Sequence, residues 1–195
     1  MNDLAMLITQ NDFLALLERC EQLEIQAVTD ANIDLSQVYP VYLASCLLTG
    51  DLQTARHVRK RSLNAKIQTA QIDAIWRVVV DFITKDYAKI YQDLDGFQWN
   101  DYMQLATHKI KINLREYMVQ LVSKVYSSIE VKQAACYFGV SENEAIQELT
   151  QRHWKYEEAT QTLYPNKQKA SVSSNYKNSN QFSRLADIVL SLEKF

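Results

Sequence analysis

Glycine and proline are scarce in this chain of 195 residues, which contains 3 glycines and 2 prolines. Architectures with many tight turns need residues that tolerate positive φ at their corners, so this composition argues against an all-β barrel or sandwich and favours long helices. Neither sign of charge dominates, because 21 Lys and Arg face 23 Asp and Glu for a net charge of -2. The chain therefore has no global field that would attract nucleic acid or an anionic membrane.

Long apolar runs are absent as well. Runs such as residues 78–80 are a few residues long, whereas a membrane span needs about 20. The first residues lack the basic region and apolar core of a secretory signal, so we expect none. The three cysteines, Cys20, Cys46 and Cys136, are odd in number and far apart. This pattern favours reduced thiols in a cytoplasmic and nuclear protein, each buried as a small core residue.

No constellation of catalytic residues is visible in the sequence. His57, His108 and His153 are isolated from one another, without a His-x-His or His-Glu-x-x-His arrangement. The chain also has no Gly-rich phosphate loop and no Gly-x-Ser-x-Gly turn. The sequence therefore predicts a protein that is not an enzyme and that uses no metal, cofactor or small-molecule substrate.

Three segments begin in the same way, with an aspartate followed at once by a bulky apolar residue. The aspartates are Asp12, Asp51 and Asp86, separated by 39 and 35 residues. Each can accept the free amide hydrogens of a first helical turn. The spacing is typical of helix pairs in tetratricopeptide-like or HEAT-like repeats. Three ordinary capped helices would give the same pattern, and the sequence leaves both interpretations open.

The positions of the glycines predict where helices end, and a long segment without Gly or Pro predicts one long helix. Gly50, Gly96 and Gly139 each follow an apolar-periodic segment, so we expect left-handed caps there. The longest predicted helix covers residues 101–127, about 40 Å, without Gly or Pro. It carries an apolar stripe of the kind that helices bury. The stripe consists of Leu105, Ile110, Leu114, Tyr117, Met118, Leu121, Val122 and Val125.

Residues 128–164 have the spacing of a winged helix. A short helix at 131–138 ends at Gly139, and Ser141 with Glu144 forms a capping box for a second helix through about Arg152. Aromatic and β-branched residues at 154–156 and 160–164 predict the two strands of a wing. The second helix carries three carboxylates against one guanidinium, which is the wrong sign for phosphate contact. Nucleic acid is therefore not expected to bind this unit.

One basic patch remains, formed by Arg56, Arg59 and Lys60 on a single helix face with Arg61 close by. A solvated helix face, a docking site for an acidic protein and an RNA-binding site are three possible explanations.

The last part of the chain changes in composition. Residues 165–181 are rich in Asn, Ser and Lys, so we expect a flexible polar loop. Residues 182–195 then carry one apolar stripe of a helix. The stripe consists of Phe182, Leu185, Ile188, Val189 and Leu192. It could join a bundle with partner proteins or fold back onto its own chain.

Several stretches, in their order and spacing, resemble PCI-domain proteins. They are 86–91 (DYAKIY) with 96–99 (GFQW), 126–129 (YSSI) with 138–142 (FGVSE), Trp154, and 183–185 (SRL) with 192–193 (LE). PCI-domain proteins are scaffold subunits shared by the proteasome lid, the signalosome and translation initiation factor three. The resemblance is greatest to the signalosome branch and covers residues 12–195.

The resemblance implies a mainly α fold, with a helical-repeat region at 1–127, a winged helix at 128–164, a loop at 165–181 and a terminal helix at 182–195. It implies a non-catalytic scaffold in the complex that removes Nedd8 from cullin-RING ubiquitin ligases, with the proteasome lid or the initiation factor as the alternative. Winged helices of this family meet edge to edge and terminal helices share a bundle. Trp154, Tyr156 and Thr162 would then lie near the edge contact, and the terminal stripe would face the bundle. Other PCI subunits are the implied partners, with subunit three of the signalosome as the expected neighbour.

Overall fold

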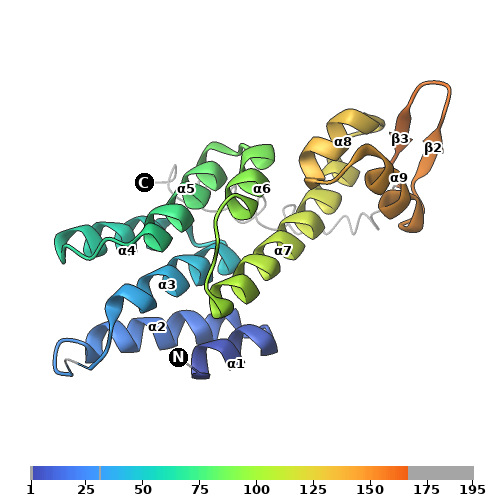
Figure 1. The fold of residues 1–195 in the computed structure, drawn as a ribbon. Helices are drawn as coiled ribbons and strands as arrows, with labels where there is room; N and C mark the ends of the chain where they lie inside the picture. The colour runs from blue at the N-terminus through green and yellow to red at the C-terminus, as the bar shows by residue number, and fades with distance from the viewer. Residues whose placement is uncertain (1, 31, 167–195) are drawn as a thin grey trace, which may run out of the picture.

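A computed structural model describes residues 2–30 and 32–166 of the chain (Figure 1). These ranges are mainly helical, as the composition predicts, with one small sheet near their end. The helices in chain order are α1 (Asn2–Gln10), α2 (Phe13–Gln26), α3 (Leu35–Thr49), α4 (Leu52–Asn64), α5 (Ala70–Thr84), α6 (Tyr87–Asp95), α7 (Asp101–Val125), α8 (Val131–Phe138) and α9 (Glu142–Gln151). The strands are β1 (Ile129–Glu130), β2 (Lys155–Glu157) and β3 (Thr162–Tyr164).

An aspartate caps the second helix of each of three successive helix pairs, α1–α2, α3–α4 and α5–α6. The side chains of Asp12, Asp51 and Asp86 accept a hydrogen bond from the backbone N–H three residues further on, at 3.1, 3.0 and 3.3 Å. Each carboxylate satisfies an amide that has no partner inside the helix and places a negative charge at the positive end of the helix dipole. The predicted starts of these three helices are confirmed.

Helix α3 lies at the centre of the helical region. All of residues 38–47 are buried, because α3 packs against α2, α4, α5 and α7 (Figure 1). A helix that is apolar around its whole circumference is stable only when other elements surround it. The other helices bury one face each, so the core of this region is organised around α3.

The glycines end helices for two different reasons. Gly50 and Gly139 have φ of +77° and +60° and form the expected left-handed caps. The same expectation is wrong for Gly96, whose φ is -75°. Its N–H donates to the carbonyl of Gln92 at 2.8 Å, and a Cβ at this position would lie 3.0 Å from that oxygen. The close approach of the backbone, rather than a left-handed turn, favours glycine there.

Helix α7 ends two residues before the predicted boundary and buries only part of its apolar stripe. Ile110, Leu114, Met118 and Val122 are buried against α1, α3 and α8, whereas other stripe residues stay exposed. The exposed residues are Leu105 at 46%, Tyr117 at 55% and Val125 at 65%. The stripe is therefore wider than the face that neighbouring helices cover. Neither α7 nor any other helix of the described ranges is both long and apolar enough to span a membrane.

The cysteines do not share one environment. Cys20 and Cys46 are buried, and burial raises the pKa of both thiols to about 12. Cys136 is exposed, so the prediction that it is a core residue is wrong. Helix α8 buries the face formed by Val131, Ala134, Ala135 and Phe138, and Cys136 lies off that face.

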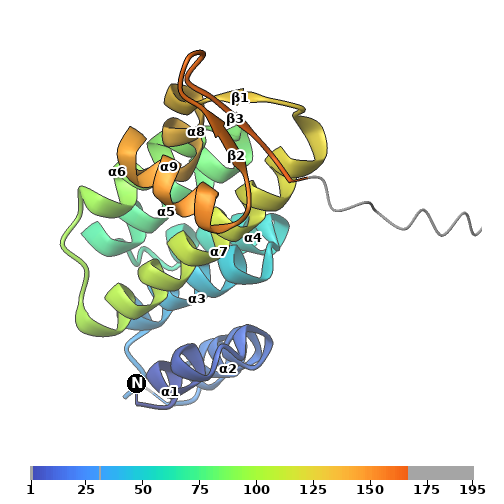
Figure 2. The same cartoon turned by 90° about the vertical axis from the view of Figure 1, so that its right-hand side faces the viewer.

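The last described elements form a compact unit at the end of α7 (Figures 1 and 2). Strand β3 pairs antiparallel with both β1 and β2, which gives the strand order β1-β3-β2. Helices α8 and α9 pack on each other, and the capping box predicted at the start of α9 is confirmed. Ser141 Oγ accepts from the N–H of Glu144 at 3.3 Å, and Glu144 accepts from the N–H of Ser141 at 3.0 Å.

Candidate functional site

The sheet of this unit presents two unpaired strand edges. Because β3 lies in the middle, β1 and β2 each have hydrogen-bond partners on one side only within the described residues. An unpaired edge exposes a row of backbone N–H and C=O groups that can pair with a strand of another chain. Both edges are therefore candidate protein-binding surfaces.

The three residues predicted near an edge contact have different positions. Tyr156 lies on the outer strand β2, opposite Leu163, and is half-buried. Thr162 lies on the central strand β3, where it can reach a partner only through its side chain. Trp154 is 4% exposed, so it supports the sheet from within and offers almost no surface to a partner. Their role in binding stays a prediction, and Tyr156 has the most suitable position for it.

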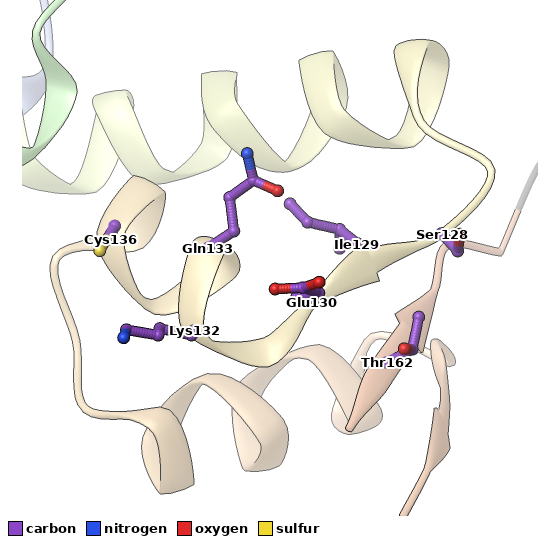
Figure 3. A pocket seen from close by; sticks show the side chains of 7 residues that line it. All are labelled: Ser128, Ile129, Glu130, Lys132, Gln133, Cys136 and Thr162. Carbon is purple, nitrogen blue, oxygen red and sulfur yellow. The ribbon is translucent and has the colours of Figure 1, made fainter. Parts of the chain in front are cut away.

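A hollow of about 630 Å³ lies beside β1 (Figure 3). Its walls come from β1, β3 and α8, and most of the side chains that face it are polar. They belong to Ser128, Ile129, Glu130, Lys132, Gln133, Cys136 and Thr162. The hollow can therefore accept polar side chains of a partner chain that adds to the β1 edge.

The unit is attached to the helical region by a close contact between Gly139 and Tyr91. A Cβ on Gly139 would lie only 2.3 to 2.6 Å from three ring atoms of Tyr91, so the backbone of the α8–α9 turn lies directly on that ring. Arg115 of α7 completes the contact. Its Nε donates to the carbonyl of Phe138 at 3.1 Å, and its guanidinium carbon lies 6.0 Å from the Tyr91 ring centroid. We call Tyr91, Arg115 and Gly139 the junction contact.

A second contact joins the end of α9 to α7. Arg152 donates to both carboxylate oxygens of Glu116, one of them at 3.0 Å, and this pairing lowers the pKa of Glu116. Both side chains are partly exposed, so the ion pair adds geometric definition more than stability. Together with the junction contact it fixes the direction in which the two sheet edges point.

The predicted basic patch is smaller than the sequence suggests. Arg56 and Lys60 are exposed. Arg59, in contrast, forms an ion pair with Asp73, with 2.6 Å between its Nη2 and the Oδ1 of Asp73, and its side chain is only 14% exposed. Its guanidinium also lies 6.0 Å from the centroid of Trp76. Arg61 donates twice to Glu24, at 2.8 Å each. Two of the cations on α4 therefore hold neighbouring helices together.

The terminal stripe of Phe182, Leu185, Ile188, Val189 and Leu192 lies outside the described residues. Among the residues described, no group of three or more His, Cys, Asp or Glu side chains is arranged to hold a metal ion.

Sequence reasoning missed the junction contact. The cap pattern explains the positive φ of Gly139 but not the aromatic ring against it. Tyr91 is far from Gly139 in the sequence, and no local signal connects the two residues. The contact between Tyr91 and Gly139 exists only because the fold brings α6 and α8 together.

Comparison with known proteins supplies information that the geometry does not. The model of the CSN8/PSMD8/EIF3K family matches residues 33–174. The COP9 signalosome complex subunit 8 of Xenopus laevis is 31% identical over 182 residues, which cover 93% of this chain and 92% of the relative. The protein of that name from Dictyostelium discoideum is 31% identical over 194 residues, 98% of this chain and 97% of its own. The one from Arabidopsis thaliana is 23% identical over 189 residues, 95% of each chain.

Proposed function

Because this chain belongs to the CSN8/PSMD8/EIF3K family, we propose that it is a subunit of a COP9 signalosome. The observation that carries the proposal is the similarity to signalosome subunits over nearly the whole of both chains. The same observation favours the signalosome over the proteasome lid and translation initiation factor three, which are the alternatives within this family.

The proposal includes the finer architecture. Residues 1–127 form a helical-repeat array, 128–164 a winged helix, 165–181 a polar connecting segment and 182–195 a terminal helix. The three helix pairs with an aspartate before each second helix support the repeat. The sequence of α8, a glycine turn, the capped helix α9 and the β2–β3 hairpin supports the winged helix.

In this proposal the chain is a non-catalytic scaffold in the complex that removes Nedd8 from cullin-RING ubiquitin ligases, in the cytoplasm and the nucleus. Its partners are other PCI subunits, with subunit three as its neighbour. An RNA-binding function has less support, because the ion pair to Asp73 engages Arg59, one of the three cations it would use.

In the proposed mechanism, a strand of a neighbouring subunit pairs with an edge of the sheet, and the orientation of that edge is fixed in advance. A neighbouring strand adds to an open edge of the sheet, and the side chains beside that edge provide specificity. Short strands supply few backbone hydrogen bonds, so their orientation has to be set before the partner arrives. The junction contact and the Arg152–Glu116 pair provide this orientation.

The test is an affinity purification of the tagged full chain from its source cells, with stoichiometric partners identified by mass spectrometry. We expect other PCI subunits and an eluate that removes Nedd8 from cullins. Proteasomal ATPases or ribosomal subunits in their place would move the protein to a sister complex. Recovery of the chain without stoichiometric partners would contradict the scaffold function.

Replacing Tyr156 with alanine tests the edge contact. We expect recovery of the neighbouring subunit to fall by about tenfold, which corresponds to about 1.4 kcal/mol of binding free energy. Tyr102→Ala is the matched control, because Tyr102 is also half-buried but lies near the start of α7, whereas the sheet follows the end of that helix. Thermal melts of both variants show whether the fold is intact. Equal recovery with the two variants would exclude the β2 edge as the contact.

A further inference from the structure

Four tyrosines gather where α6, α7 and α8 meet. The rings of Tyr87 and Tyr137 form an edge-to-face pair with centroids 6.5 Å apart. Burial raises the pKa of Tyr87, and the neighbouring phenols of Tyr117 and Tyr137 raise it further. The adjoining phenol of Tyr137 also raises the pKa of Tyr126. Val125, which immediately precedes Tyr126 and lies about two helical turns after Tyr117, is included with them, and we call these five residues the tyrosine face.

The described elements leave the tyrosine face largely uncovered. Tyr117 is 55% exposed and Val125 is 65% exposed, whereas the other three tyrosines are half-buried. Gln133 donates to the hydroxyl of Tyr137 at 3.3 Å and so fixes one side of the face. Tyrosines bury a large apolar area at a low entropic cost, and an exposed group of them is typical of a binding surface.

The described part of the chain ends beside this face. Strand β3 runs antiparallel to β1 with Leu163 opposite Ile129, so residues 164–166 run back alongside the turn that follows Tyr126. Another 29 residues follow. Residues 167–181 could span about 20 Å as a random coil. This distance is enough to bring the apolar stripe of residues 182–192 onto the tyrosine face.

We propose that residues 182–195 of the free chain dock as an amphipathic helix on the tyrosine face. The lengths agree, because residues 182–192 would span about 15 Å as a helix and Tyr117 to Val125 spans about 12 Å. A short tether also gives the segment an effective concentration in the millimolar range. A second copy of the chain, at ordinary concentrations, competes poorly with a tethered segment.

Docking gives the terminal stripe a covered position before assembly. A bundle of partner helices would then have to compete with the tyrosine face for the terminal stripe. This competition rests on the proposed function, whereas docking of the stripe in the free chain does not. Partner binding through the stripe would therefore be weaker in the full chain than in a variant whose tyrosine face is disrupted.

The test is hydrogen exchange, read by mass spectrometry, on the purified full chain. We expect the amides of residues 182–192 to exchange at least about tenfold more slowly than in an unstructured peptide. Tyr117→Asp and Val125→Asp should each remove this protection. Leu105→Asp is the matched control, because Leu105 is 46% exposed on the same helix but outside the tyrosine face. Unchanged exchange of helices α2 to α5, which do not contribute to the tyrosine face, shows that each variant is folded.

Three results of the exchange experiment would overturn the proposal. They are unprotected amides in the unmodified chain, an equal loss of protection with Leu105→Asp, and protection that increases with protein concentration, which indicates a second copy.

A crosslinking experiment provides an independent check, because Cys136 is exposed close to Gln133. Ser191→Cys should crosslink to Cys136 within one chain, whereas crosslinks only between chains would contradict the proposal. Failure here leaves the family assignment and the purification test of assembly unaffected.

Discussion

Replacing Gly139 with alanine is expected to lower the free energy of unfolding by about 2–4 kcal/mol. The left-handed φ of +60° accounts for about 1 kcal/mol, because alanine tolerates that region poorly. The remainder comes from the new Cβ, which would meet the Tyr91 ring at 2.3 Å. That ring is 5% exposed and cannot move without disturbing a packed core, for which overpacking costs about 1–3 kcal/mol. For a chain of this size the melting temperature should fall by roughly 10 °C.

Gly50 provides the matched control for this experiment. Its φ of +77° is also left-handed, but a Cβ there would meet nothing within 4 Å. Gly50→Ala should therefore cost only about 1 kcal/mol. In a Tyr91→Ala background, Gly139→Ala should cost the same small amount, because the ring it collides with is gone. Equal effects of the two glycine substitutions in the unmodified chain would show that the junction contact does not restrain the α8–α9 turn.

The same substitution links stability to assembly. If the junction contact sets the direction of the sheet edges, Gly139→Ala should weaken partner recovery more than Gly50→Ala at a temperature where both variants are folded. The comparison separates orientation of the edges from overall stability, because Gly139 packs on the Tyr91 ring in the junction contact, whereas Gly50 caps α3 and meets no such ring.

Features determined by a few neighbouring residues could be predicted from the sequence. The caps at Asp12, Asp51 and Asp86 and the capping box at Ser141 depend on groups three residues apart, so the pattern contains the whole interaction. The mainly helical fold could also be predicted, because the scarcity of glycine and proline can be counted directly from the sequence. Such signals define where helices begin but not which faces they bury.

Features that depend on packing between distant segments could not be predicted. The periodicity of α7 cannot show that Tyr117 stays exposed, because exposure depends on which helices lie beside it. The misassigned Cys136 has the same cause. At the candidate site, residues 127–130 are compatible with either a short strand or a helix start, and nothing in the sequence shows which strand β1 would pair with, so the position of Thr162 on a central strand became apparent only in the fold. Tyr156, on an outer strand, keeps its predicted role as a candidate contact residue.

Raising the pH is expected to unfold the chain cooperatively between about pH 9 and pH 12. Burial raises the pKa of the Cys20 and Cys46 thiols from 9.0 to about 12, and that of the Tyr39, Tyr42 and Tyr91 phenols from 10.0 to about 12. Within this window the unfolded chain has released protons that the folded chain still holds, so the free energy of unfolding falls as pH rises. A pKa difference of one unit is worth about 1.4 kcal/mol, and together these groups can remove stability on the order of 10 kcal/mol. This amount is comparable to the whole stability of a domain.

Circular dichroism and tyrosinate absorbance, followed together, should therefore change in a single steep transition. Tyr91→Phe is the sharpest variant, because the Tyr91 hydroxyl is buried and finds no hydrogen-bond partner among the described residues. The substitution removes one linked proton and a buried unpaired polar group, so the transition should move to higher pH. Tyr117→Phe removes a hydroxyl outside this group of buried tyrosines and should leave the transition where it is. Gradual tyrosinate formation near pH 10 with helicity retained would show that water reaches these phenols in the folded chain, and the ring packed on Gly139 could not then be a rigid support for the sheet.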